Sequence, residues 1–66
     1  MASDVLKGKW KQLKGEVKER WGELTDDEVD QVQGESQQLV GLLQEKYGHT
    51  KQEAEDEIDE FLGEYS

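Results

Sequence analysis

The chain lacks cysteine and proline, and it has a single histidine among its 66 residues. Without cysteine it forms neither a disulfide nor a thiolate metal site, and one histidine excludes a metal site built from several. The absence of cysteine also agrees with a reducing compartment. The mean hydropathy is low, at −1.05, but the missing proline and the regular spacing of apolar residues favour an ordered chain.

Long apolar segments are missing as well. The longest uninterrupted apolar runs are two residues, such as Leu42-Leu43, so we expect no membrane-spanning helix. The first ten residues, MASDVLKGKW, lack the apolar core of a signal peptide, and we therefore expect a cytoplasmic location. A chain of this length forms one domain, residues 1–66, that buries only about 60% of its unfolded surface, so we expect marginal stability.

The formal net charge of −9 is distributed unevenly along the chain. Residues 1–20 contain six basic and three acidic side chains, whereas residues 21–66 contain two basic and fourteen acidic side chains. The net charges of the two parts are therefore +3 and −12. Because the acidic part repels phosphate, the charge argues against nucleic acid and anionic membranes as partners.

The spacing of apolar residues predicts four amphipathic helices, at residues 4–21, 26–33, 35–47 and 51–62. The inward-facing residues are expected to be Leu6, Trp10, Leu13, Val17 and Trp21 in the first helix, Val29 and Val32 in the second, Leu39, Val40, Leu43 and Tyr47 in the third, and Ala54, Ile58, Phe61 and Leu62 in the fourth. Both tryptophans are therefore expected to anchor the core.

The helix ends carry their own signals. Thr25 with Glu28, and Thr50 with Glu53, have the three-residue spacing of capping boxes, which begin helices. Glycines are expected to end the four helices, at Gly22, Gly34, Gly48 and Gly63. For Gly22 we expect the left-handed conformation that commonly terminates a helix.

The chain contains an internal repeat. GKWKQLKGEVKERWG, residues 8–22, aligns with GESQQLVGLLQEKYG, residues 34–48, with six identical residues in fifteen positions. A Thr-x-x-Glu capping box follows each segment. The sequence therefore predicts an all-α fold, a small four-helix bundle of two packed αα-hairpins related by a pseudo-repeat.

A candidate interaction surface combines basic and small residues. Lys7, Lys11, Lys14 and Lys18 form a stripe beside the apolar face of the first helix. We expect this stripe to be solvated or to pair with the acidic stripe Glu53, Glu57, Glu60 and Glu64. The alternatives are a phosphate-bearing surface and a protein partner.

The glycines inside the helices complete that surface. On a helical wheel, Gly8, Gly15 and Gly41 lie nearly opposite the apolar faces, so they either face water and lower helix stability or leave a groove for a partner. Leu42 is expected to lie off the core face. A monomer is favoured, with weak self-association through Leu42 as the alternative.

No group of residues predicts catalysis, a cofactor or a metal. There is no cysteine nucleophile and no phosphate-cradling loop, and DDEVD lacks the glycine and distal glutamate of a calcium loop. His49 directly precedes a capping threonine, where a packing role is expected. We therefore expect a protein that is not an enzyme and binds no cofactor.

The segments GKWKQLKGEVKERWGELTDDEVD, QLVGLLQEKYG and EAEDEIDEF together resemble the CsbD-like bacterial stress-response proteins. The resemblance implies a small, very hydrophilic cytoplasmic protein made under general stress, with two crossed helical hairpins and no established activity. Glu35, Ser36 and Leu42 stand where the family commonly has basic residues, and His49 where it commonly has isoleucine.

These observations lead to one main hypothesis and two alternatives. In the main hypothesis, a non-enzymatic stress protein protects or binds other macromolecules when water is scarce, through its dense charge and exposed glycines. In the second, the basic helix with its tryptophans binds an anionic membrane or nucleic acid. In the third, the chain forms a homo-oligomer. The sequence names no partner.

Overall fold

The computed structural model describes residues 3–64, whose regular structure is entirely helical, as predicted. The five helices are α1 (Ser3–Gly8), α2 (Trp10–Arg20), α3 (Asp26–Val32), α4 (Ser36–Tyr47) and α5 (Lys51–Gly63). The bounds of α3, α4 and α5 agree with the predicted helices to within one residue. The predicted number of helices is wrong, because residues 4–21 form two helices.

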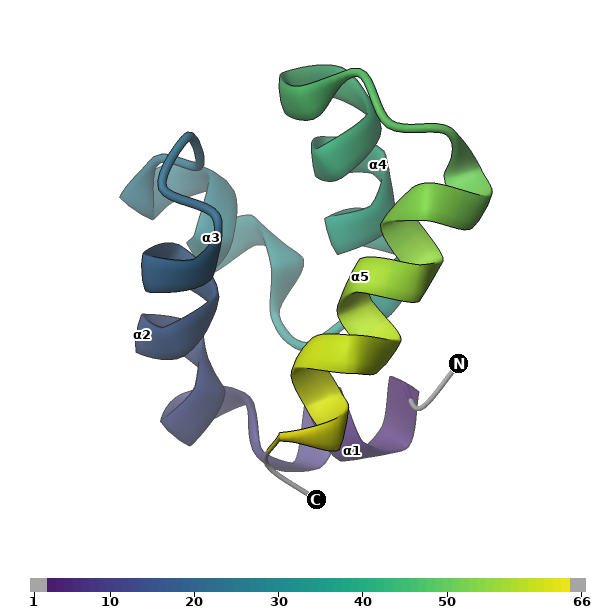
Figure 1. The fold of residues 1–66 in the computed structure, drawn as a ribbon. Coiled ribbons are helices and arrows are strands. Elements are labelled where there is room, and N and C mark those ends of the chain that lie inside the picture. Colours follow the sequence, from purple (N-terminus) through teal and green to yellow (C-terminus); the bar gives the residue numbers. More distant parts are fainter. Residues whose placement is uncertain (1–2, 65–66) are drawn as a thin grey trace.

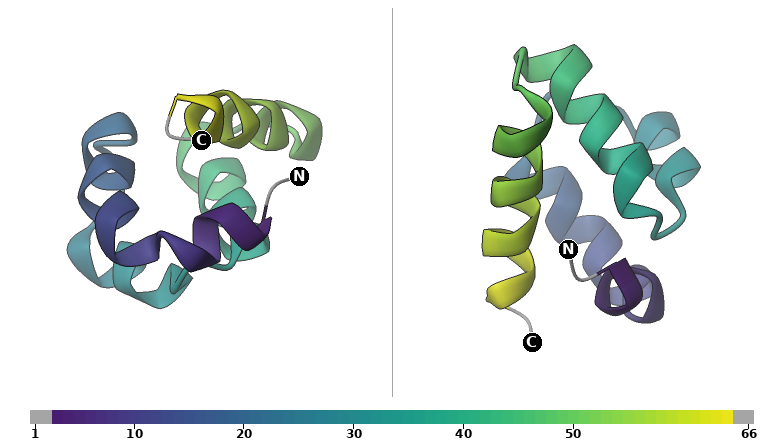
Figure 2. Two further views of the ribbon diagram at one scale, coloured as in Figure 1. Left: turned by 90° about the horizontal axis from the view of Figure 1, so that it is seen from below. Right: turned by 90° about the vertical axis from the view of Figure 1, so that its right-hand side faces the viewer.

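The helices surround one apolar core (Figure 1). α2 packs against α3, and α4 packs against α5, so each pair forms a helical hairpin. α3 also packs against α4, which joins the hairpins, and α1 packs against both α2 and α4. α1 and α2 meet at a bend along one side of the molecule (Figure 2).

Most of the side chains that the apolar spacing predicts lie in the core, and Leu24 joins them. The buried members of the core are Leu6, Leu13, Val17, Trp21, Leu24, Val29, Val32, Leu39, Val40, Leu43, Ala54, Ile58, Phe61 and Leu62. Trp10 and Tyr47 are half-buried and pack against this core rather than within it. Leu42 does the same, so the expectation that it lies off the core face is wrong.

The predicted first helix is interrupted at Lys9, whose backbone (φ −110°, ψ 16°) departs from helical geometry. The N–H of Lys9 still donates to the Val5 carbonyl over 3.0 Å, and α2 then starts without a side-chain cap. The preceding residue, Gly8, is a poor helix former, which makes this a weak point of the segment. The periodicity of the apolar residues continues across the break, which explains why the sequence predicts one helix.

The turn between α3 and α4 contains a glycine that packing requires. Gly34 has φ +80° and follows Gln33, which is also left-handed at φ 49°. A Cβ at position 34 would lie 2.7 Å from the Lys7 Cα atom, so the backbone of α1 rests directly on this turn. Only glycine allows both the left-handed conformation and this approach without strain.

Two other predicted helix ends differ in outcome. Gly48 is left-handed at φ 68°, and its N–H donates to the Gln44 carbonyl. Gly22 is not left-handed, and that prediction is wrong. The chain leaves α2 through a turn in which the N–H of Leu24 donates to the Trp21 carbonyl over 3.0 Å, so no left-handed residue is needed.

Both predicted capping boxes are present. At the start of α3, the Thr25 N–H donates to Glu28 Oε1 over 3.0 Å, and the Glu28 N–H donates to Thr25 Oγ1 over 3.2 Å. At the start of α5, Thr50 and Glu53 make the same exchange over 2.8 and 3.1 Å. These bonds satisfy backbone groups that a helix start otherwise leaves unpaired.

Candidate functional site

The lysine stripe faces the short acidic helix α3 and the turn after it. Lys14 pairs with Asp30, and Lys18 pairs with Asp26. These contacts correct the expectation that the stripe pairs with the acidic residues of α5. The reason is topological, because α3 is the helix that lies beside α2.

These ion pairs are exposed to solvent, and one of them changes the pKa of its acidic partner. Hydrogen bonding and the positive charge of Lys18 lower the pKa of Asp26. Lys7 lies 3.3 Å from Glu35, and these side chains are 67% and 57% exposed. Exposed pairs of this kind contribute at most about 1 kcal/mol each. The stripe is thus partly neutralised, which agrees with internal pairing of its charges.

The acidic residues of α5 have other partners. Arg20 at the end of α2 lies 3.3 Å from Glu64 and 3.7 Å from Glu60. The same guanidinium lies 5.9 Å from the centre of the Trp21 ring. Glu53 belongs to the capping box of α5, and the Thr50 backbone N–H lowers its pKa. Arginine, rather than the lysine stripe, thus joins α2 to α5.

Equivalent residues of the two aligned segments reach across to the opposite hairpin. The Trp21 indole Nε1–H donates to Glu57 Oε1 of α5 over 3.1 Å, and the Tyr47 hydroxyl accepts from the Glu23 N–H over 3.1 Å. The residues just before them, Arg20 and Lys46, also pair with acids of the opposite hairpin. The hairpins are therefore held together by a reciprocal exchange of contacts.

Lys46 pairs with a glutamate that also caps a helix. Its Nζ lies 2.9 Å from Glu28 Oε2, and Glu28 also caps α3. The backbone N–H of Thr25 and then the Lys46 ammonium lower the pKa of Glu28, and Glu28 in turn raises the pKa of Lys46. The start of α3 is thus tied to the end of α4.

His49 packs between aromatic and acidic neighbours, as its position before Thr50 predicts. Its ring stacks on Tyr47, with 5.7 Å between ring centres and 15° between planes. Its Nε2 atom pairs with Glu57, the residue that also accepts from Trp21. The histidine therefore joins the loop before α5 to the contact between hairpins.

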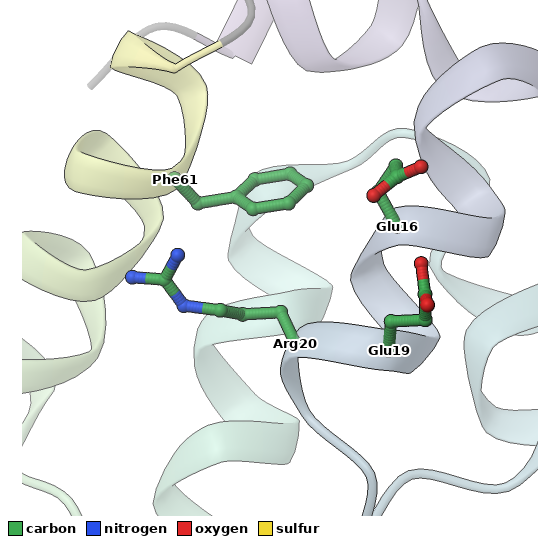
Figure 3. A pocket seen from close by; sticks show the side chains of 4 residues that line it. All are labelled: Glu16, Glu19, Arg20 and Phe61. Atoms are coloured by element: carbon green, nitrogen blue, oxygen red, sulfur yellow. The ribbon is translucent and has the colours of Figure 1, made fainter.

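A hollow of about 260 Å³ lies between α2 and α5 (Figure 3). Glu16 and Glu19 form one side, the Arg20 side chain extends toward α5, and the Phe61 ring extends from α5 toward Glu16. Phe61 is 1% exposed and lies 5.2 Å from the Trp21 ring, so its ring seals the core. These four residues provide two carboxylates and a guanidinium but no hydroxyl, thiol or imidazole group.

A second hollow, of about 570 Å³, lies over the break between α1 and α2. Its lining is continuous in sequence: Lys7, Gly8, Lys9, Trp10, Lys11 and Gln12. The structure therefore brings Lys7, Gly8 and Lys11 of the candidate surface together. The candidate surface predicted from the sequence did not include Lys9 and Trp10. Lysine at every second position from Lys7 to Lys11 is the signal that could have added Lys9.

The remaining residues of the candidate surface are dispersed. Lys14 and Lys18 face α3 through their ion pairs, while Gly41 and Leu42 line a separate hollow of about 430 Å³ beside Gln31 and Glu45. An added Cβ at Gly8, Gly15 or Gly41 would meet no atom within 4 Å, so these glycines face outward as the helical wheel predicts. Their role toward a partner stays a prediction.

Residues 3–64 lack two features, a group of metal-binding side chains and a membrane-spanning helix. No three or more histidine, cysteine, aspartate or glutamate side chains are grouped so that they could hold a metal ion. None of the five helices has the length and apolar character needed to cross a membrane.

Comparisons with known proteins identify relatives of nearly the whole chain. The model of the family described as CsbD-like matches residues 4–56. A UPF0337 protein of Pseudomonas aeruginosa is 57% identical over 61 residues, which cover 92% of this chain and 94% of the relative. A UPF0337 protein of Bordetella pertussis is 52% identical over 62 residues, which cover 94% of both chains.

A third relative gives the same result at slightly lower coverage. The UPF0337 protein YjbJ of Escherichia coli K12 is 52% identical over 58 residues, which cover 88% of this chain and 84% of the relative. No solved structure matches the chain. The family model and these relatives agree with the resemblance seen in the sequence, and the chain belongs to the CsbD-like family.

Proposed function

We propose that this protein is a non-enzymatic, cytoplasmic component of the bacterial stress response that protects other macromolecules when water is scarce. Membership of the CsbD-like family supports a role in the general stress response. The proposed mechanism is that several molecules of this protein surround a partner. Their strongly charged, hydrated surfaces keep the partner from contacting other proteins. A net charge far from zero opposes association of proteins by mutual repulsion.

The distribution of charge carries this proposal. The net charge is −9 on 66 residues, yet a closed apolar core is kept inside. Exposed acids without a described ion pair occur on α3, α4 and α5, as Asp27, Glu45 and Asp59 show. The protein thus has much hydrated surface for its size, while its apolar side chains are not offered to a client.

The proposal also covers the origin of the two helical hairpins. We infer that the two hairpins are copies of one helical unit, with α1 as an extension of the first. Support comes from the six identities between residues 8–22 and 34–48 and from the reciprocal contacts of Trp21 and Tyr47. A repeated unit presents charge on both sides of the molecule without a dedicated active site.

A drying assay tests the protective role. A dehydration-sensitive enzyme is dried and rehydrated with this protein, with albumin at equal mass, or with buffer alone, and the recovered activity is measured. The proposal expects clearly more recovered activity with this protein than with albumin. Equal protection by albumin would contradict it.

A matched variant tests whether charge is responsible. Asp27→Asn/Glu45→Gln/Asp59→Asn makes the net charge less negative, from −9 to −6, without removing an ion pair of the described residues. We expect this variant to keep its fold by circular dichroism and to protect less well than the parent protein. Undiminished protection would mean that surface charge is not the mechanism.

A further inference from the structure

The hollow over the α1–α2 break has the composition of a ligand site. It is an open surface hollow of about 570 Å³, a volume within the range of small-molecule sites, and is lined by three lysines, a tryptophan, Gly8 and Gln12. No carboxylate lines it. We propose that this hollow binds a nucleotide, with the base against the Trp10 indole and the phosphates beside the lysine ammonium groups.

The first argument is the environment of Trp10. Its side chain is half-buried and packs against the core, which holds it in place, and Trp10 is one of the residues that line the hollow. Trp21, by contrast, is 2% exposed and fully engaged in the core. A fixed, partly exposed indole is a platform on which a planar base can stack.

The second argument is the charge beside that platform. Lys7 and Lys11 line the hollow on either side of Trp10 in sequence, and Lys9 precedes it directly. The pair between Lys7 and Glu35 joins side chains that are more than half exposed, so a phosphate competes with it at little cost. Farther along α2, Lys14 and Lys18 face α3 in their ion pairs, so Lys7 and Lys11 are the members of the stripe that line the hollow.

The third argument concerns the size and shape of the ligand. The apolar residues near the break, Val5 and Trp10, pack against the core, whereas insertion into a membrane requires apolar side chains that project from the surface. A nucleic acid duplex would extend over acidic surface, but a small ligand meets mostly charges within a Debye length of about 10 Å. The observations therefore favour a single nucleotide unit.

A base joined to phosphate is present both in a free nucleoside triphosphate and in one nucleotide of a single-stranded nucleic acid. The inference goes beyond the protective role and does not depend on it, because binding is measured without drying. Titration of the ¹⁵N-labelled protein with ATP, up to about 5 mM, detects dissociation constants in the millimolar range. Tripolyphosphate, an eight-residue single-stranded oligonucleotide and phosphatidylglycerol vesicles form parallel arms.

The two tryptophans provide an internal reference for this titration. We expect ATP to shift the Trp10 indole N–H and the backbone amides of residues 7–12, while the Trp21 indole N–H stays in place. Binding by tripolyphosphate should be about tenfold weaker, because it has no base to stack. If one nucleotide unit of the oligonucleotide binds more tightly than ATP, the source is a single strand and the site is the same.

Variants distinguish binding of ATP in the hollow from attraction of ATP to any positive charge on the protein. Trp10→Leu should weaken ATP binding about tenfold, because the stacking surface is lost. Lys9→Gln/Lys11→Gln should weaken it by about two- to thirtyfold, the loss expected for two exposed ion pairs. The control Lys14→Gln/Lys18→Gln makes the same change in the net charge of the protein and should weaken binding less than about twofold.

Several results would overturn the proposal. They are the absence of any shift at residues 7–12, equal binding of tripolyphosphate and ATP, equal losses in the two double-lysine variants, and binding to vesicles with none to ATP. Circular dichroism confirms the fold of each variant first. The Trp10 signal of the parent protein keeps the test decisive if a variant fails to fold.

Discussion

The aligned segments 8–22 and 34–48 begin with glycines that have different roles. Gly8 ends α1, and a side chain added there would meet no atom within 4 Å. Gly34 is left-handed and lies directly under the backbone of Lys7. The repeat therefore places glycine at both positions, but only the second is required by packing. Tertiary neighbours, rather than the repeated residues, decide which glycine the fold needs.

The same comparison applies to the last glycines and the aromatic residues before them. Gly48 is left-handed and Gly22 is not. Trp21 is buried and donates to a side chain of the opposite hairpin, whereas Tyr47 is half-buried and accepts from a backbone N–H. At the aromatic position the first segment thus fills the core more completely, whereas at the last glycine only the second segment uses a left-handed residue. Substitutions at matched positions measure this asymmetry.

The largest difference is expected at the first glycines. Gly34→Ala should lower the free energy of unfolding by about 2–4 kcal/mol, because alanine is strained at positive φ and its Cβ collides with Lys7. Urea unfolding followed by circular dichroism measures this loss. Gly34→Asn separates the two causes, because asparagine tolerates the left-handed conformation but keeps the collision.

The outward-facing glycines provide the control for this prediction. Gly8→Ala/Gly15→Ala/Gly41→Ala should raise the free energy of unfolding by about 2 kcal/mol in total, since alanine is the better helix former and space is available. A loss of stability in this triple variant would mean that these positions are packed or bent. A neutral Gly34→Ala would mean that α1 does not rest on the α3–α4 turn.

A smaller difference is expected between the two aromatic residues. Trp21→Phe should lower the free energy of unfolding by about 2 kcal/mol, because it leaves a gap in the core and removes the donor to Glu57. Tyr47→Phe removes one hydroxyl acceptor and should cost about 1 kcal/mol or less. Thermal unfolding by circular dichroism compares them, and equal losses would refute the asymmetry between the segments.

Local signals in the sequence were sufficient for most of the fold. The apolar stripe from Leu6 to Trp21 and the boxes at Thr25 and Thr50 depend on residues three or four positions apart, and the structure contains them. The break at Lys9 was missed because the apolar period continues through it. The approach of Lys7 to Gly34 was missed because it joins positions far apart in the chain.

The candidate site was less accessible to sequence reasoning for the same physical reason. Which acids meet Lys14 and Lys18 depends on which helix lies beside α2, and both α3 and α5 offered acidic residues. The hollow around Trp10 arises at the break, so a continuous helical wheel does not show it. Charge spacing identified the basic helix, but only the packing of helices shows where its charge is neutralised.

The smallest effect is expected from the two capping boxes, whose glutamates differ in their neighbours. The pKa values of Glu28 and Glu53 both lie below the ordinary value of 4.5, and Glu28 has Lys46 as an additional partner. A carboxyl whose pKa falls on folding stabilises the protein above its unfolded pKa and loses this effect as pH falls through its folded pKa. Glu28→Gln and Glu53→Gln should therefore be less stable than the parent at pH 6.

At acidic pH these differences should disappear, because the parent carboxyls are then protonated as well. Urea unfolding from pH 6 to about pH 3 measures the convergence, and NMR titration of the side chains should find Glu28 titrating below Glu53. Asp59→Asn, which removes an exposed carboxylate, controls for the change in net charge. If Glu28→Gln stayed equally destabilised at pH 3, its loss would come from packing, and the ion pair with Lys46 would not distinguish the two hairpins.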